Sequence, residues 1–387
     1  MSDYNLNECE YTLKKLVAVD TSQPKGNERD IIDVIESLLT EGEHHSEWLQ
    51  FQRFDHGNNR ASLVAKIDGQ NSAKDGLAFV GHVDTVAFGD ISKWTHHPLS
   101  AHAEKGMVYG RGSADQKGGV AAMIIAAKHI LRSAQKPKRT LLFCFTADEE
   151  FGGIGVLSVV KSGLFDDVSE IIITEPTDEQ IGICEKGALW LKITASGALA
   201  HGSRPEVGIN AIDLLTEFLG SFKKETVFEG VHELLNTTTC SVTKISGGIM
   251  ANVIPDTADM TLDIRTLPGV SSADVIKAAK GVFEEICKRD SRIGFDLEVI
   301  TDQPPAQTSK DAPIVTKMGE IFRRRGMDDA VRGLYFYTDI GRIVPFYQHP
   351  FIILGPGDDK QAHQLNEFIE IASVARISEI YVEYIEA

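Results

Sequence analysis

The chain has 387 residues, of which 42% are hydrophobic and 25% are charged, an ordinary globular composition with enough apolar material for two domains. Its 39 basic and 56 acidic residues give a formal net charge of −17, which would repel nucleic-acid phosphates and anionic lipids. There is no apolar run of transmembrane length, and the five scattered cysteines form no C-x-x-C pair. We therefore expect a cytoplasmic protein without nucleic-acid or membrane partners.

The first half of the chain alternates predicted helices and strands. Apolar residues at helical spacing predict a helix at 31–39, and apolar runs predict strands at 62–67, 77–83, 141–145 and 171–174. Further helices are predicted at 119–131 and 154–160. Such alternation predicts an α/β fold with a mainly parallel sheet, helices on both faces, and an active site where the strands end.

From residue 187 to residue 302 the predicted elements follow a different order. They are a strand at 189–194, a helix at 209–222, strands at 240–245 and 258–266, a helix at 273–288 and a strand at 295–300. This β-α-β-β-α-β order is typical of a two-layer α+β (ferredoxin-like) unit. Helices at 313–324 and 368–385 and a strand at 351–354 would complete the first domain. The predicted domains are therefore 1–186 with 303–387, and 187–302.

Polar clusters follow several predicted strands of the first domain, at 81–85, 113–119, 147–150, 174–177 and 361–364. They contain a set of nitrogen and oxygen donors, namely His82, Asp115, Glu150, Glu175 and His363. A donor set without thiolate suits zinc, cobalt or manganese. One ion would underuse five ligands, whereas two ions bridged by one carboxylate would use them all and leave a position for water.

Each cluster alone also has an ordinary interpretation. The acids at 148–150 would suit a helix start, and Asp115 with Lys117 would suit an exposed turn. What favours a metal site is that five such groups recur in similar loop positions, with glycines around Asp115. The other histidines, including the pairs His44–His45 and His96–His97, are interpreted as surface residues, with His201 as the exception. Zincin, P-loop, dinucleotide-binding and serine-hydrolase motifs are absent from the sequence.

In this order and these surroundings, the clusters resemble those of the co-catalytic metallopeptidase family that contains acetylornithine deacetylase, succinyl-diaminopimelate desuccinylase, aminoacylase and glutamate carboxypeptidase. The resemblance covers nearly the whole chain, and its most specific part is GRGSAD at 110–115 followed by KGG at 117–119. It implies that His82 and Glu175 hold one metal ion and that Glu150 and His363 hold the other. Asp115 would bridge both ions, which are expected to be zinc, with cobalt or manganese as alternatives.

The resemblance also implies roles for residues outside the ligand set. Glu149 would be the general base, and Asp84 would orient the imidazole of His82 from behind. The insert would be a lid and dimerisation domain, from which His201 reaches the active site of the partner chain in a homodimer. The ordinary alternative for His201 is a cap of the following helix. Three further residues would contact substrate: Asn252, Arg265 and Thr338.

We expect these residues to hydrolyse the amide bond of an N-acyl amino acid, releasing a carboxylate and a free amine. Arg265 would bind a substrate carboxylate, although without the family it would be read as an exposed strand arginine. An acetylornithine deacetylase-like activity in amino-acid metabolism is favoured. The alternatives are a carboxypeptidase or dipeptidase, and a desuccinylase, against which the aromatic run at 335–337 counts because desuccinylases have glycines there. An inactive metal-holding module is disfavoured because base and ligands are all present.

Overall fold

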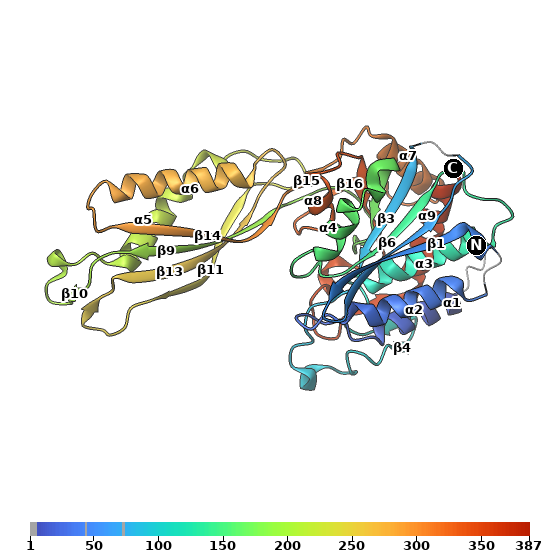
Figure 1. Cartoon of the computed structure of the whole chain (residues 1–387), viewed down its shortest axis with the longest axis horizontal. Coiled ribbons are helices and arrows are strands. Elements are labelled where there is room, and N and C mark those ends of the chain that lie inside the picture. Colours follow the sequence, from blue (N-terminus) through green and yellow to red (C-terminus); the bar gives the residue numbers. More distant parts are fainter. Residues whose placement is uncertain (1–5, 43–44, 72–73) are drawn as a thin grey trace. The chain divides into compact units, whose positions relative to one another are not determined.

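The computed structural model describes residues 6–42, 45–71 and 74–387, and the chain divides into two compact units (Figure 1). The first unit takes in the chain up to residue 183 with 308–332 and 338–387, and the second takes in 184–307 and 333–337. The catalytic and lid roles of the two predicted domains stay predictions. Residues 1–5, 43–44 and 72–73 of the predicted first domain lie outside the described residues, and so does His44, which was predicted to be a surface residue.

The first unit is built on a mixed sheet whose centre is parallel, in the order β1-β2-β6-β3-β7-β17-β8. The central strands β3 and β6 are buried along their whole length, β3 pairs in parallel with β6 and β7, and β17 pairs in parallel with β7. This arrangement confirms the predicted α/β class. The strands are β1 (Leu49–Gly57), β2 (Arg60–Ile67), β3 (Gly76–His82), β6 (Leu141–Thr146), β7 (Val168–Ile173), β8 (Ile181–Glu185) and β17 (Phe351–Ile353).

Helices pack on this sheet, and aromatic rings contact one another within the sheet and between the sheet and α9. Phe79 of β3 stacks on Phe143 of β6 with ring centroids 5.1 Å apart, and it also meets Tyr381 at 5.0 Å. The helices are α1 (Leu6–Val17), α2 (Glu28–Thr40), α3 (Lys117–Arg132), α4 (Ile154–Lys161), α7 (Pro313–Arg324), α8 (Ile340–Ile343) and α9 (Ile371–Glu386). Short 3-10 turns are η1 (Ser46–Trp48), η2 (Ile91–Lys93), η3 (Leu164–Asp167) and η6 (Asp359–Gln361).

A small antiparallel sheet, in the order β18-β5-β4, also belongs to the first unit. Its strands are β4 (His102–Glu104), β5 (Met107–Tyr109) and β18 (Phe368–Glu370). The predicted helix at 368–385 is therefore wrong in its first three residues, because these residues pair with β5 and α9 begins only at Ile371. In the described part of the chain no helix is long and apolar enough to cross a membrane.

The second unit is a four-stranded antiparallel sheet in the order β11-β13-β9-β14, with α5 and α6 packed on it (Figure 1). Along β9 and β13 every second residue is buried, which is the pattern of strands with one face on a core. The elements are β9 (Ala188–Ser196), α5 (Ala211–Phe222), β11 (Thr239–Gly247), β13 (Thr257–Arg265), α6 (Ser272–Cys287) and β14 (Gly294–Gln303). This is the predicted β-α-β-β-α-β order.

Short elements complete the structure. They are β10 (Ala200–His201), β12 (Val253–Ile254), β15 (Ala306–Gln307), β16 (Val331–Leu334), η4 (Pro205–Val207) and η5 (Thr226–Phe228). Side-chain caps begin both long helices of the second unit: Asn210 accepts the N–H of Ile212 at α5, and Ser271 accepts the N–H of Asp274 at α6.

Candidate metal centre

The end of β3 and the loops after β6 and β7, before α3 and after η6 bring the five predicted ligands together in two groups that share Asp115. One group is His82, Asp115 and Glu175, and the other is Asp115, Glu150 and His363; within each group the donor atoms lie within 4.8 Å of one another. The Nε2 of His82 lies 3.1 Å from Oδ1 of Asp115 and 3.7 Å from Oε1 of Glu175. The Nε2 of His363 lies 3.3 Å from Oδ2 of Asp115 and 3.1 Å from Oε2 of Glu150. Asp115 thus turns one oxygen toward each group.

The charges of this cluster fit divalent cations. Burial, together with mutual repulsion between the acids, raises the pKa of Glu175 and of Glu150, and Asp115 contributes to both shifts. Burial alone would lower the pKa of His82, but Glu175, Asp115 and Asp84 outweigh it and hold that pKa well above its usual value. Hydrogen bonds to Asp115 and Glu150 raise the pKa of His363 to about 10. Bound cations would neutralise these buried carboxylates in the way that protons do in their absence. The donor set therefore fits two divalent metal ions.

Asp84 positions both His82 and the loop that carries the acids. The Nδ1 of His82 donates to the backbone oxygen of Asp84 at 2.9 Å, so its Nε2 is left facing Asp115 and Glu175. The carboxylate of Asp84 lies farther from that ring, at 3.6 Å, and accepts instead the backbone N–H groups of Glu149 at 3.0 Å and Glu150 at 3.3 Å. The predicted orienting role of Asp84 therefore extends to the position of the two glutamates.

Glu149 and Glu150 are adjacent but differ in their contacts. The carboxylate of Glu150 contacts His363, whereas no hydrogen bond or ion pair engages that of Glu149 among the described residues. Glu149 is 6% exposed, and burial together with the charges of Glu175 and Glu150 raises its pKa well above the usual value. A buried carboxyl group that has a raised pKa and is not engaged in a hydrogen bond or ion pair is suited to accept and return a proton.

The turn at 148–153 is fixed by residues that the sequence did not single out. Asp148 has a positive φ of 71°, and its carboxylate pairs with Arg60 at 2.8 Å while its backbone oxygen accepts the N–H of Gly152 at 2.9 Å. A Cβ at Gly153 would lie 2.1 Å from Nε of Arg342, so this guanidinium packs directly over the turn. Neither Arg60 nor Arg342 follows a predicted strand, which is the signal that marked the other site residues.

Glu367 is a further residue that the sequence did not single out. Its fully buried carboxylate accepts the N–H groups of Gly112, Ala114 and Asp115 at 2.8–3.0 Å and pairs with the guanidinium of Arg111 at 2.8 Å. The peptide bond that follows Asp115 is cis. Glu367 therefore holds in place the loop that presents Asp115. It lies just beyond the polar cluster at 361–364, so extending that cluster by three residues would have found it.

His201 and the three predicted substrate contacts are not all grouped. In the second unit His201 and Asn252 are neighbours, because the backbone oxygen of Asn252 accepts the N–H of Gly202 at 2.7 Å. The ring of exposed His201 contacts the hydroxyl of Ser203 at 2.8 Å. Arg265, at the end of β13, is held by Asp263 at 2.9 Å.

Thr338, by contrast, belongs to the first unit and is fully buried. Its hydroxyl accepts the N–H of Ile340 at 3.2 Å, which fixes the start of α8. Its neighbour Asp339, also buried, accepts the hydroxyl of Thr146 at 2.6 Å, and burial raises the pKa of Asp339 to about 6. The structure therefore gives Thr338 a local backbone partner.

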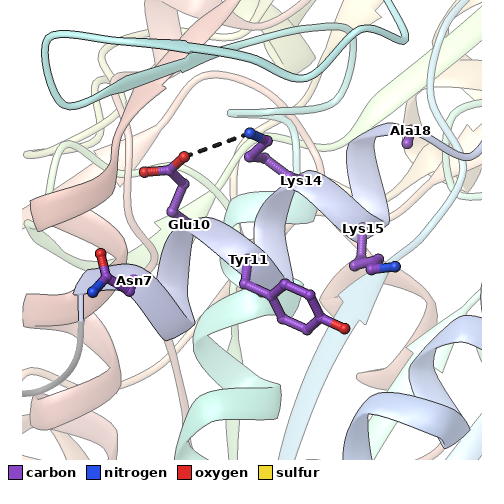
Figure 2. A pocket seen from close by; sticks show the side chains of 6 residues that line it. All are labelled: Asn7, Glu10, Tyr11, Lys14, Lys15 and Ala18. Carbon is purple, nitrogen blue, oxygen red and sulfur yellow. Dashed lines mark ion pairs between the residues drawn. The ribbon is translucent and has the colours of Figure 1, made fainter.

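A hollow of about 370 Å³ lies over α1, lined by Asn7, Glu10, Tyr11, Lys14, Lys15 and Ala18. Figure 2 shows the ion pair between two of the lining residues, Glu10 and Lys14, whose charged atoms are 3.5 Å apart. All of its lining comes from one helix and its end, and it contains none of the predicted site residues. We therefore place the candidate site at the strand ends and not here.

Comparison with known proteins identifies the family and the fold. The family model described as peptidase family M20/M25/M40 matches residues 78–387. A probable succinyl-diaminopimelate desuccinylase of Staphylococcus aureus is 28% identical over 417 aligned positions, covering 100% of this chain and 97% of that protein. The crystal structure of aminopeptidase PepT from Bacillus cereus has a TM-score of 0.79 at 19% identity and covers 99% of this chain and 98% of that one. A Bacillus subtilis protein described as a dinuclear metal-binding peptidase has a TM-score of 0.72 at 16% identity, with 98% and 97% covered. The solved structures show that the fold is shared.

Proposed function

Because the chain belongs to peptidase family M20/M25/M40, whose members are metallohydrolases, we propose that it hydrolyses the amide bond of an N-acyl amino acid with two divalent cations. One observation carries this proposal. Two ligand groups share Asp115, and the unengaged carboxylate of Glu149 comes from the same loop as Glu150. The description of the Bacillus subtilis relative as dinuclear supports the number of ions.

His82, Asp115 and Glu175 would hold one ion, and Asp115, Glu150 and His363 would hold the other, with zinc as the expected metal because the donors are imidazole and carboxylate. When bound, the pair would polarise the amide carbonyl and lower the pKa of a water molecule. The side chains of this protein would carry out the proton transfers and bind the substrate.

Glu149 would take the proton from the attacking water and return it to the departing nitrogen, so that one carboxyl group serves first as base and then as acid. Asp84 keeps Glu149 in place through its backbone N–H. The ion pair of Arg60 with Asp148 fixes the same turn at the residue before Glu149. The products of such a reaction are a carboxylate and a free amine.

The substrate would carry a free carboxylate, for which Arg265 offers a planar guanidinium. The guanidinium of Arg265 lies over the ring of Tyr337, 5.8 Å from the ring centroid. It also donates a hydrogen bond to Asp263, so Asp263 and the substrate carboxylate would share this guanidinium. An acetylated amino acid of the acetylornithine type is the substrate that we favour. The desuccinylase relative supports an N-succinyl amino acid as the second candidate, and the aminopeptidase supports a short peptide.

The second unit would also form a homodimer, through which His201 would donate a hydrogen bond to the developing oxyanion in the partner's site. Its edge strand β11 is exposed along most of its length, including Val242 at 37% and Ile245 at 61%. Ile249 and Met250, 76% and 65% exposed, follow directly. A strand that pairs on one side only within the described residues, and that carries exposed apolar side chains among its polar ones, is a surface that a second copy can extend.

Amine release from a panel of N-acetyl amino acids, N-succinyl amino acids and dipeptides tests the proposal. The zinc-loaded protein should release amine from at least one class, and only when the substrate's carboxylate is free. Glu149→Gln is the matched control, because it removes the proton carrier and leaves the five ligands unchanged. No release from any class by the metal-loaded chain would contradict the proposal.

A further inference from the structure

A separate group of metal-ligand side chains lies in the first unit, on β4 and on the loop that precedes it. Its members are His96, His102 and Glu104, whose donor atoms lie within 4.8 Å of one another. None of the three belongs to the five ligands described above. From the sequence alone His96 is interpreted as a surface residue, since nothing there shows that it meets His102.

The strand and the loop converge on this group. Because side chains alternate along a strand, His102 and Glu104 project from the same face of β4, and Nε2 of His102 lies 3.7 Å from Oε2 of Glu104. His96 lays its ring on that of His102, with centroids 3.8 Å apart and planes inclined by 16°. The ring of Tyr109, which is opposite His102 in the register of β4 and β5, lies 5.5 Å from His96.

The backbone on either side of His96 is anchored near β4. An ion bound by both imidazoles would lie in the plane of each ring, so the side chain of His96 would have to turn out of its stack with His102. The N–H of Thr95 donates to Oδ1 of Asn366 at 2.6 Å. On the other side, the oxygen of Pro98 accepts the N–H of Arg111 at 2.9 Å. A site whose backbone is fixed before the ligand arrives loses less conformational entropy on binding.

The donor atoms are also available. Among the described residues, no hydrogen bond engages a ring nitrogen of His96, and the ring of His102 has Glu104 as its ionic neighbour. Lys105 competes for the carboxylate of Glu104, with Nζ 2.9 Å from Oε1. The side chain of Lys105 is 85% exposed, so it can turn toward solvent when a cation arrives.

We propose that His96, His102 and Glu104 bind a divalent cation, separate from the co-catalytic pair, that ties the loop at 95–101 to β4. Two imidazoles and one carboxylate select zinc, cobalt, nickel or copper over magnesium and calcium. Three protein ligands leave at least one position for water. The ion would act as a cross-link in the loop that follows His82 and Asp84, and this role does not depend on the reaction proposed above.

Equilibrium dialysis of the full-length protein against zinc, followed by metal analysis, tests the site. The double variant His96→Ala with His102→Ala should bind one equivalent less than the parent chain. His97→Ala removes an exposed imidazole next to the site and should bind as many equivalents as the parent. Lys105→Gln removes a surface ion pair and should lower the Kd of this equivalent by about 1.4- to fivefold.

A second readout does not depend on metal counting. Diethylpyrocarbonate modification mapped by mass spectrometry should show that zinc protects His96 and His102 in the parent chain and leaves His97 reactive. If the double variant does not fold, Glu104→Gln, a change at an exposed side chain, should weaken the same protection. Equal zinc content in parent and double variant, or modification of both histidines that zinc does not change, overturns the proposal. Because the result is a difference of one equivalent, it stands apart from the number of ions at the co-catalytic groups.

Discussion

Replacing Glu367 by glutamine should destabilise the first unit by a predictable amount. One carboxylate oxygen accepts the N–H groups of Ala114 and Asp115, and the other accepts the N–H of Gly112 and pairs with Arg111. A glutamine keeps one acceptor oxygen, but its NH2 group then faces two donors and the buried guanidinium loses its counter-charge. Removing one partner of a buried ion pair costs about 3–5 kcal/mol. We expect a loss of that size in the free energy of unfolding.

Urea denaturation of the metal-free protein, followed by far-UV circular dichroism, measures this loss without a contribution from bound ions. Glu370→Gln is the matched control, because the exposed carboxylate of Glu370 lies 3.2 Å from Arg376, and the loss of this surface ion pair should change the free energy of unfolding by no more than about 0.5 kcal/mol. Glu367→Gln should also weaken zinc binding, since Asp115 loses a backbone partner. A Glu367→Gln variant as stable as the control, with zinc binding intact, would refute the role assigned to this residue.

Further predictions concern the co-catalytic residues. Glu149→Gln should keep both metal ions in metal analysis yet lose about 10²–10⁴-fold or more in kcat, and full turnover would remove it as the base. Asp115→Ala should empty both metal positions in a zinc titration, whereas His363→Ala should chiefly weaken one; two tight sites in Asp115→Ala would disprove the bridge. His201→Ala should lower kcat by about 10²–10³-fold. Mixing the His201→Ala and Glu149→Gln variants should restore activity, because a heterodimer contains one site in which both residues are intact. No recovery despite demonstrated subunit exchange would rule out a shared site.

The fold was predictable where apolar periodicity is long enough to read. The helix expected at 313–324 has those bounds as α7. The element order of the second unit was predicted from apolar runs of six or more residues, and the six observed elements are each nine or more residues long. Strand β1 was missed because most of its side chains are exposed. The signal lay in its turn: Asn58 and Asn59, with φ of 49° and 61°, form the two-residue connection of a hairpin to β2.

The three-residue strands β4, β5 and β18 carry no period at all, and residues 368–370 were read as helix because the pairing of Phe368 with Tyr109 joins parts of the chain far apart. The stacking of His96 on His102 is hidden for a related reason, since only the fold of the loop brings the two rings together. The sequence therefore did not disclose either the long-range pairing of β18 with β5 or the local fold of the loop that stacks these rings.

The same distinction holds at the candidate site. Polar clusters, most of which follow an apolar run closely, could be selected from the sequence, and the structure gathers all five proposed ligands. The residues that hold them could not. Glu367 lies 252 positions from Asp115, and Arg60 lies 88 positions before Asp148, so neither pair leaves a local pattern. Which residues support a site depends on the completed fold.

Anomalous diffraction from zinc-soaked crystals tests the central claim most directly. The account predicts two zinc peaks on either side of the Asp115 carboxylate, one contacted by His82 and Glu175 and the other by Glu150 and His363. A single peak at this carboxylate, or peaks that leave Asp115 uncoordinated, would contradict the two-metal centre on which the proposed hydrolysis depends.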